Sequence, residues 1–374
     1  MRKNDASKRT DTDQIRRRRE AYEQRKKEWQ KAKRLGRTPR HRFALQANVP
    51  FDPMARREQI ILPVEFSLGT NFENVAHILA QIREVAIEER RPVMLHFAHV
   101  QTVEPAAALA LVSEIHRTRG LRGPGFVTGT YPQSPGVYHS LKEMGFFAVL
   151  NILDRGDAPE IETEPDKPIF LRFISETKVL PQLADGFVSI IEKALFPLNA
   201  LARERLVVAI KEAMQNTLDH AHPDHGRDRK QRHRWWMSSW VNVERKEVSI
   251  VFFDQGVGIP KTLQPTTYEH IVAAISNLST FRFSSAPSDG EMIAAATEIF
   301  RSGTGTPGRG RGFANMKSFV DACNEGELRV LSNRGRYHYM GPTLEKCSDS
   351  RQSLGGTVIE WRFRHDGAVE MIDG

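Results

Sequence analysis

The sequence predicts an α/β fold in two successive units, preceded by a basic N-terminal arm. Strand-like and helix-like segments alternate between residues 57 and 145, and an acidic, Pro-containing linker follows at 151–168. Two amphipathic helices and several apolar strands then fill the rest of the chain. Such alternation is typical of helices packed on a sheet. A length of 374 residues is enough for two or three domains with ordinary cores.

Residues 1–48 are predicted to be a basic arm, helical or disordered. Residues 1–43 contain 17 Lys and Arg against 6 Asp and Glu, so the rest of this +8 chain is close to −3. The helical stretch at 12–35 has too thin an apolar stripe to fold alone. Two interpretations stay open: a solvated arm, or an arm that docks on an acidic surface of nucleic acid or protein through Tyr22 and Trp29.

The first unit, residues 49–165 with its linker, is predicted to contain a partly parallel sheet. Its nearly continuous apolar run PVMLHFAHV suits a buried strand. The expected elements are a strand at 57–64, a helix at 73–90, a strand at 92–100, a helix at 105–118 ended by Gly120, a strand at 125–131, and a helix at 137–144 ended by Gly145.

The second unit, residues 166–374, is predicted to begin with a strand and two long helices. A long segment rich in Ser, Thr, Gly and Pro at 261–311 exceeds an ordinary connection, so it predicts a functional lid. The other expected elements are a strand at 169–175, helices at 182–197 and 199–222, two strands with a turn at 244–246, helices at 289–301 and 313–323, and three closing strands.

The first chemistry-bearing segment is the helix KEAMQNTLDHAH at 211–222. At about 100° per residue, Glu212, Asn216 and Asp219 fall on one side, opposite an apolar stripe. An amide oxygen such as that of Asn216 can serve Mg²⁺ together with phosphates. Glu212 could accept a proton from an attacking water or hydroxyl. Taken alone, a solvated helix face explains this pattern equally well.

The second segment, VFFDQGVGIP, is an apolar strand that ends in Asp254. A buried carboxylate there can accept a hydrogen bond from the exocyclic amine of adenine, which distinguishes adenine from guanine. Gly256 and Gly258 allow the backbone to approach a base or sugar closely. A strand followed by an ordinary Gly-rich turn is the alternative.

The third segment, GTGTPGRGRGF, places Gly308, Gly310 and Gly312 before a helix whose free N–H groups favour phosphate. Arg309 and Arg311 add positive charge. A P-loop is excluded because the sequence contains no Gly-Lys pair, and a preceding helix argues against a dinucleotide fold. Thr357, after two glycines at the start of the last strand, could bond an ordered water or phosphate.

In this order and spacing, the motifs resemble the N, G1 and G2 boxes of GHKL ATPases, the group of gyrase, heat-shock chaperones and histidine-kinase-like proteins. The resemblance covers about 166–374. It implies a Bergerat-fold α/β sandwich, a mixed sheet with helices on one face, that binds ATP and Mg²⁺. It further implies Asn216 as the Mg²⁺ ligand, Asp254 on adenine and Glu212 as the base. EAMQNTLDHA is especially similar to the anti-sigma-factor serine kinases, and His220 matches a family histidine.

The segment PVMLHFAHVQTVEPAAALALVSEI resembles the strand–loop–helix of STAS domains, the fold of anti-sigma-factor antagonists. Those antagonists carry a phosphorylated Ser at the start of this helix, where the present chain has Glu104, Pro105 and Ala106. The resemblance therefore implies a STAS-like regulatory or dimerising module that is not a substrate of its own kinase-like half. No helix with the phospho-acceptor pattern of histidine autokinases precedes the second unit.

We expect an ATP-binding regulatory protein in which Mg²⁺-dependent hydrolysis closes the lid and signals to a protein partner or second copy. The alternatives are a serine/threonine kinase acting on a separate partner and a nucleotide-dependent switch that binds nucleic acid through residues 1–43. Two distant cysteines, and the lack of an 18-residue apolar run or a signal peptide, favour a cytoplasmic protein without a membrane segment. We interpret His220, His222 and His225 as side chains that favour the dipole at a helix C-terminus, in preference to a zinc site.

Overall fold

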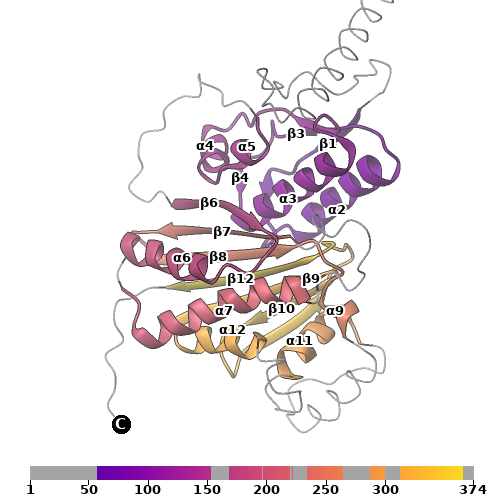
Figure 1. Ribbon diagram of the computed structural model, residues 1–374. Helices are drawn as coiled ribbons and strands as arrows, with labels where there is room; N and C mark the ends of the chain where they lie inside the picture. Colours follow the sequence, from indigo (N-terminus) through magenta and orange to yellow (C-terminus); the bar gives the residue numbers. More distant parts are fainter. Residues whose placement is uncertain are drawn as a thin grey trace, which may run out of the picture.

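The computed structural model describes residues 57–152, 168–195, 197–219, 221, 234–263, 287–299 and 312–364. The basic arm and most of the predicted lid therefore lie outside the described residues. The chain forms an N-terminal α/β domain (57–152) that packs on the sheet of a C-terminal α/β domain (168–364) (Figure 1).

The N-terminal domain is built on the parallel sheet β1-β3-β5, as predicted. A second, two-stranded parallel pair joins β2 to β4. The elements are β1 (Glu58–Ile61), β2 (Glu65–Phe66), α2 (Phe72–Ile82), the π-helical turn η1 (Arg83–Glu88), β3 (Val93–His96), β4 (Thr102–Val103), α3 (Pro105–Arg122), β5 (Val127–Gly129), α4 (Pro135–Glu143) and α5 (Phe146–Val149).

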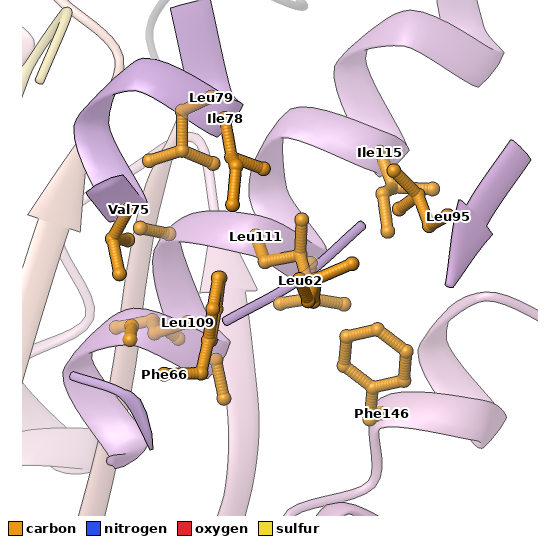
Figure 2. Packing of buried hydrophobic residues seen from close by; sticks show 14 of the residues in the cluster. Leu62, Phe66, Val75, Ile78, Leu79, Leu95, Leu109, Leu111, Ile115 and Phe146 are labelled. Carbon is orange, nitrogen blue, oxygen red and sulfur yellow. The ribbon is translucent and has the colours of Figure 1, made fainter. Parts of the chain in front are cut away.

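Helix α3 is the central element of the N-terminal domain, and every residue from Pro105 to Ile115 is buried. In Figure 2, leucines and Ile115 of α3 lie among apolar side chains from α2, β3 and α5. The helix does not end at Gly120, so that expectation was wrong. It continues for two more residues and ends before Gly123, whose φ of +107° is open to glycine and whose N–H donates to Arg119 O.

The C-terminal domain contains a seven-stranded sheet in the order β11-β10-β9-β12-β8-β7-β6, and every neighbouring pair is antiparallel. The α/β sandwich is confirmed, but the described sheet is not mixed. Its elements are β6 (Ile169–Glu176), α6 (Pro181–Ala194), α7 (Ala200–Asp219), β7 (Trp235–Asn242), β8 (Glu247–Asp254), α9 (Ile259–Thr262), α11 (Asp289–Ile299), α12 (Gly312–Asp321), β9 (Glu325–Ser332), β10 (Gly335–Tyr339), β11 (Glu345–Asp349) and β12 (Thr357–Arg364).

The two faces of this sheet have different coverings. Alternate residues of β8 and β12, such as Phe252 and Trp361, pack under α6, α7, α11 and α12. The intervening residues, such as Phe253 and Val358, join the apolar core of the N-terminal domain. Figure 1 shows the N-terminal domain on one side of the sheet and α6, α7 and α12 on the other. Because successive side chains of a strand point to opposite faces, each strand contributes to both cores.

Largely buried charges reinforce the interface between the domains. Glu104, which precedes α3, accepts hydrogen bonds from Ser67 Oγ at 2.8 Å and from Arg362 of β12. Burial raises the pKa of Glu104, but the guanidinium groups of Arg362 and Arg329, together with the hydrogen bonds from Gly69 and Ser67, bring the net pKa below its ordinary value. The same two arginines also donate to the buried carboxylate of Glu360, at 2.7 and 2.9 Å respectively. Such paired charges fix the relative position of two surfaces.

We expect Phe253→Ala to destabilise the whole chain by about 3–5 kcal/mol, since it opens a cavity in the core shared by both domains. Chemical denaturation, followed by tryptophan fluorescence and circular dichroism, should give one coincident transition that shifts as a unit. Ile190→Ala, at a side chain that is 48% exposed, is the control and should cost less than about 1 kcal/mol. Separate transitions for the two domains would contradict a shared core.

Candidate functional site

A row of side chains crosses the helix-covered face of the sheet at one end of its central strands. Ser332, Thr357, Asp254 and Trp235 are successive cross-strand partners on β9, β12, β8 and β7. Ser332 and Thr357 lie 3.0 Å apart between their hydroxyl oxygens. Asp254 and Thr357, which are far apart in the sequence, thereby become neighbours.

Asp254 is a buried carboxylate without a cationic partner among the described residues. It accepts a hydrogen bond from the backbone N–H of Gly256, at 2.8 Å. Burial raises the pKa of Asp254 from its ordinary value to about 7, although the Gly256 hydrogen bond acts in the opposite direction. A carboxylate kept in such surroundings is poised to accept a hydrogen bond from a neutral donor such as an amine.

The loop after Asp254 is packed so closely that it requires glycine. A Cβ on Gly256 would lie 2.4 Å from Ala221 Cβ, and one on Gly258 would lie 2.4 Å from the amide of Asn333. Ala221, two residues beyond α7, is fixed to the same loop because Val257 N–H donates to Ala221 O at 2.8 Å. Asn333 donates to Val257 O at 2.9 Å, so the turn between β9 and β10 holds the loop from the other side.

The two glycines before Thr357 bring β12 against the end of β8. A Cβ on Gly356 would lie 2.1 Å from the carbonyl oxygen of Asp254, a distance that the packing cannot accommodate. Gly355 adopts φ +75°, a left-handed conformation that favours glycine. The pair therefore allows Thr357 to enter the sheet directly beside Asp254.

Helices α7 and α12 bring the predicted catalytic and phosphate-binding segments together. A Cβ on Gly312, the first residue of α12, would lie 3.2 Å from both Glu212 Oε2 and Asn216 Nδ2. Asn315, one turn into α12, donates to Glu212 Oε1 at 3.2 Å. Glu212 and Asn216 are half-buried and lie one turn apart on α7. The N-terminus of α12, where free N–H groups favour anions, thus meets a carboxylate and an amide.

Asp219 is exposed at the end of α7, where it accepts a hydrogen bond from Gln215 at 2.8 Å. The other predicted phosphate-binding residues, Gly308, Arg309, Gly310 and Arg311, lie outside the described residues, as do His220, His222 and His225. The structure thus brings together Glu212, Asn216 and Gly312 in one group, and Asp254, Gly256, Gly258 and Thr357 in another. Ala221, two residues beyond α7 in the sequence, contacts the Asp254 loop of the second group.

Ser332 and Asn333 belong to this site but were not predicted. Ser332 Oγ accepts a hydrogen bond from Ile259 N–H at 2.8 Å and is fully buried. Asn333 has φ +54°, and its backbone N–H donates to Gly356 O. The sequence signal for them was the Ser-Asn-Arg-Gly turn after an apolar strand, a pattern common to hairpins without a ligand.

Gly356→Ala should destabilise the chain strongly because its Cβ would overlap the Asp254 carbonyl. Gly341→Ala is a matched control, since Gly341 also has positive φ but a Cβ there would meet nothing within 4 Å. We expect the loss for Gly356→Ala to exceed that for Gly341→Ala by at least about 2 kcal/mol in urea unfolding. Equal losses would show that backbone conformation, and not the close approach, makes glycine necessary.

Comparison with known protein families supports the resemblance of this part of the chain to GHKL ATPases. The family described as "Histidine kinase-, DNA gyrase B-, and HSP90-like ATPase" matches residues 202–366, which include all but the first two residues of α7, the Asp254 loop, α12 and β12. No curated protein matches the chain. Within the described residues, no helix is long and apolar enough to cross a membrane. Residues 202–366 are therefore a histidine kinase-, DNA gyrase B- and HSP90-like, or GHKL-type, ATPase domain.

Proposed function

We propose that this chain is a regulatory ATPase that binds ATP with Mg²⁺ and hydrolyses it slowly to signal to a protein partner or a second copy. The observation that carries the proposal is the contact of Gly312, at the start of α12, with Glu212 and Asn216. It brings a candidate base, a candidate Mg²⁺ ligand and an anion-binding helix end to one point.

Asp254 is the proposed adenine-recognition group. In its ionised form, the carboxylate accepts a hydrogen bond from the exocyclic amine, whereas guanine presents a carbonyl oxygen there and would repel it. The glycines of the following loop support this role indirectly, since they let the loop pack against Ala221 and Asn333 and so hold the backbone beside the Asp254 carboxylate. Thr357, beside Asp254 on β12, is the proposed partner for an ordered water or phosphate.

The residues on α7 fit Mg²⁺ bound together with phosphates. Across the described ranges, no three His, Cys, Asp or Glu side chains gather to hold a metal ion by themselves. An amide oxygen of Asn216 is a hard ligand of the kind that Mg²⁺ accepts while phosphates and waters complete its shell. Bound there, Mg²⁺ would neutralise charge on the phosphate oxygens. Gly308, Arg309, Gly310 and Arg311 stay predicted phosphate-binding residues, with Asp219 a predicted contributor.

Glu212 is the proposed general base. Its Oε1 accepts a hydrogen bond from Asn315, which orients the carboxylate, while Oε2 lies toward Gly312. A carboxylate held in this way can take a proton from a water that attacks the terminal phosphate. The same position would also serve a protein hydroxyl, so a serine/threonine kinase is the second outcome that an experiment must separate.

The N-terminal domain is the proposed STAS-like regulatory module, which its parallel sheet and following helix support. Glu104 stands at the start of α3, already paired with arginines of the ATPase domain. The basic arm keeps its proposed role as a contact for nucleic acid or protein, through residues 1–43. The lid at 261–311 keeps its proposed response to nucleotide.

Glu212→Gln should lower ATP turnover at least about 100-fold, because it removes the base, while leaving ATP affinity within about threefold. Turnover and binding are measured with γ-labelled ATP and Mg²⁺. Glu204→Gln, an exposed carboxylate about two turns earlier on α7, should leave both unchanged. Unchanged turnover in Glu212→Gln would remove the base assignment, and wild-type label retained on protein would favour the kinase.

Asp254→Asn should have opposite effects on the two properties of the protein: its folding stability should rise at high pH, and its affinity for ATP should fall. The folded-state pKa of about 7 exceeds the ordinary 3.8, so the folded chain holds this proton more tightly. The stability that the neutral form of Asp254 contributes to the wild-type protein is therefore lost as pH rises from about 4 to about 7. We expect the stability of Asp254→Asn relative to wild type to increase by about 2–3 kcal/mol between pH 5 and pH 8. ATP affinity at pH 8 should fall at least about tenfold.

Melting curves at both pH values and titration with a fluorescent ATP analogue test this expectation. Wild-type affinity should rise as pH increases through about 7, since only the ionised carboxylate accepts from the amine with its full charge. An Asp254→Asn protein that is no more stable at pH 8, or that binds ATP normally, would contradict the proposed role of this carboxylate.

A further inference from the structure

The N-terminal domain touches the nucleotide-site loops directly through Glu114 of α3. Its carboxylate is buried, and Glu114 Oε2 accepts a hydrogen bond from Gln255 Nε2 at 3.1 Å. Gln255 stands between Asp254 and Gly256, the two residues whose mutual hydrogen bond shapes the proposed adenine site. A side chain of the N-terminal domain thus fixes the residue that follows the recognition carboxylate.

Arg83, at the start of η1, holds the second loop. It donates to Leu354 O at 3.0 Å and to Ser353 O at 3.4 Å. A Cβ on Gly355 would lie 2.7 Å from the Arg83 guanidinium carbon, so the glycine is needed for this approach as well. Arg83 also pairs with Glu114 Oε2 at 3.2 Å. Glu114, which holds the loop after Asp254, and Arg83, which holds the loop before Thr357, therefore form one connected network.

This network is local to the proposed nucleotide site. The charge of Glu104, also at the domain interface, pairs with Arg362 on β12, five residues beyond Thr357, and with Arg329 on β9, three residues before Ser332. At about 3.4 Å per residue along an antiparallel strand, these partners lie roughly 17 Å and roughly 10 Å from the end of the sheet that carries the site. Both sets of contacts hold the domains together, but the Glu104 pair is remote from the loops that Glu114 and Arg83 reach.

We propose that Glu114 and Arg83 are positioning residues for the nucleotide site, so that ATP affinity depends on their contacts with the two loops beside Asp254. This inference rests on the proposed function. Removing either partner leaves the other charge buried with less compensation, and without Glu114 the Gln255 amide loses its acceptor. The loops on both sides of Asp254 would relax, which weakens recognition of adenine and leaves the Glu212 group unaltered. The regulatory input is the local contact of Glu114 on α3 and Arg83 on η1 with these loops.

A double-mutant cycle in the full chain tests the proposal. Affinity for a fluorescent ADP analogue is measured for wild type, Glu114→Ala, Gln255→Ala and the double variant. We expect Glu114→Ala to bind about tenfold more weakly, within the usual range of coupling between sites. If Glu114 acts through Gln255, the double variant binds no more weakly than Gln255→Ala alone. Glu104→Gln, the control, should lower the melting temperature and leave affinity unchanged.

Each outcome supports or overturns the inference. Unchanged affinity in Glu114→Ala, full additivity with Gln255→Ala, or equal weakening by Glu104→Gln would overturn it. Should Glu114→Ala not fold, Arg83→Gln, at a side chain that is 17% exposed, replaces it and must bind at least about fivefold more weakly. Wild-type protein that binds no nucleotide would overturn the proposed function itself, whereas wild-type binding that both variants preserve overturns the positioning role alone.

Discussion

The strand register of the seven-stranded sheet is the constraint on which the site depends. Both faces of the sheet are buried, so a slip of one residue in β8 would turn Phe253 toward the helices and Asp254 toward the N-terminal domain. The apolar cost of such a slip on two cores at once fixes the register. That register, in turn, places Thr357 beside Asp254 and both on the helix-covered face.

Much of the fold was predictable because it depends on strong local patterns. The parallel strands of the first domain, the long helices α6 and α7, and the apolar strands β7, β8 and β12 all follow from periodicity and burial. The GHKL family assignment was predictable for another reason: several individually weak motifs occur in a fixed order, and the family match covers them. The individual roles of Glu212, Asn216 and Asp254 stay predictions.

The remaining features depend on contacts that no local pattern encodes. Strand β11 is short, polar and at the sheet edge, so it lacks the apolar alternation that marks a strand. Asn333 joins the site because the β9–β10 turn meets the Val257 loop. Glu114 resembles an ordinary helix carboxylate until α3 is placed against Gln255. The antiparallel order of the sheet likewise reflects long-range pairing, where the family resemblance implied a mixed sheet.

The covering of the second sheet face has a consequence for how this chain can be divided. Trp236, Phe253 and Val358 are buried in the core that the N-terminal domain builds on that face. A fragment cut in the linker after residue 152 would present these side chains as one contiguous apolar surface, of the kind that promotes self-association in monomeric proteins. We therefore expect an excised ATPase domain to associate or lose structure, because the domain that precedes it covers one of the two faces of its sheet.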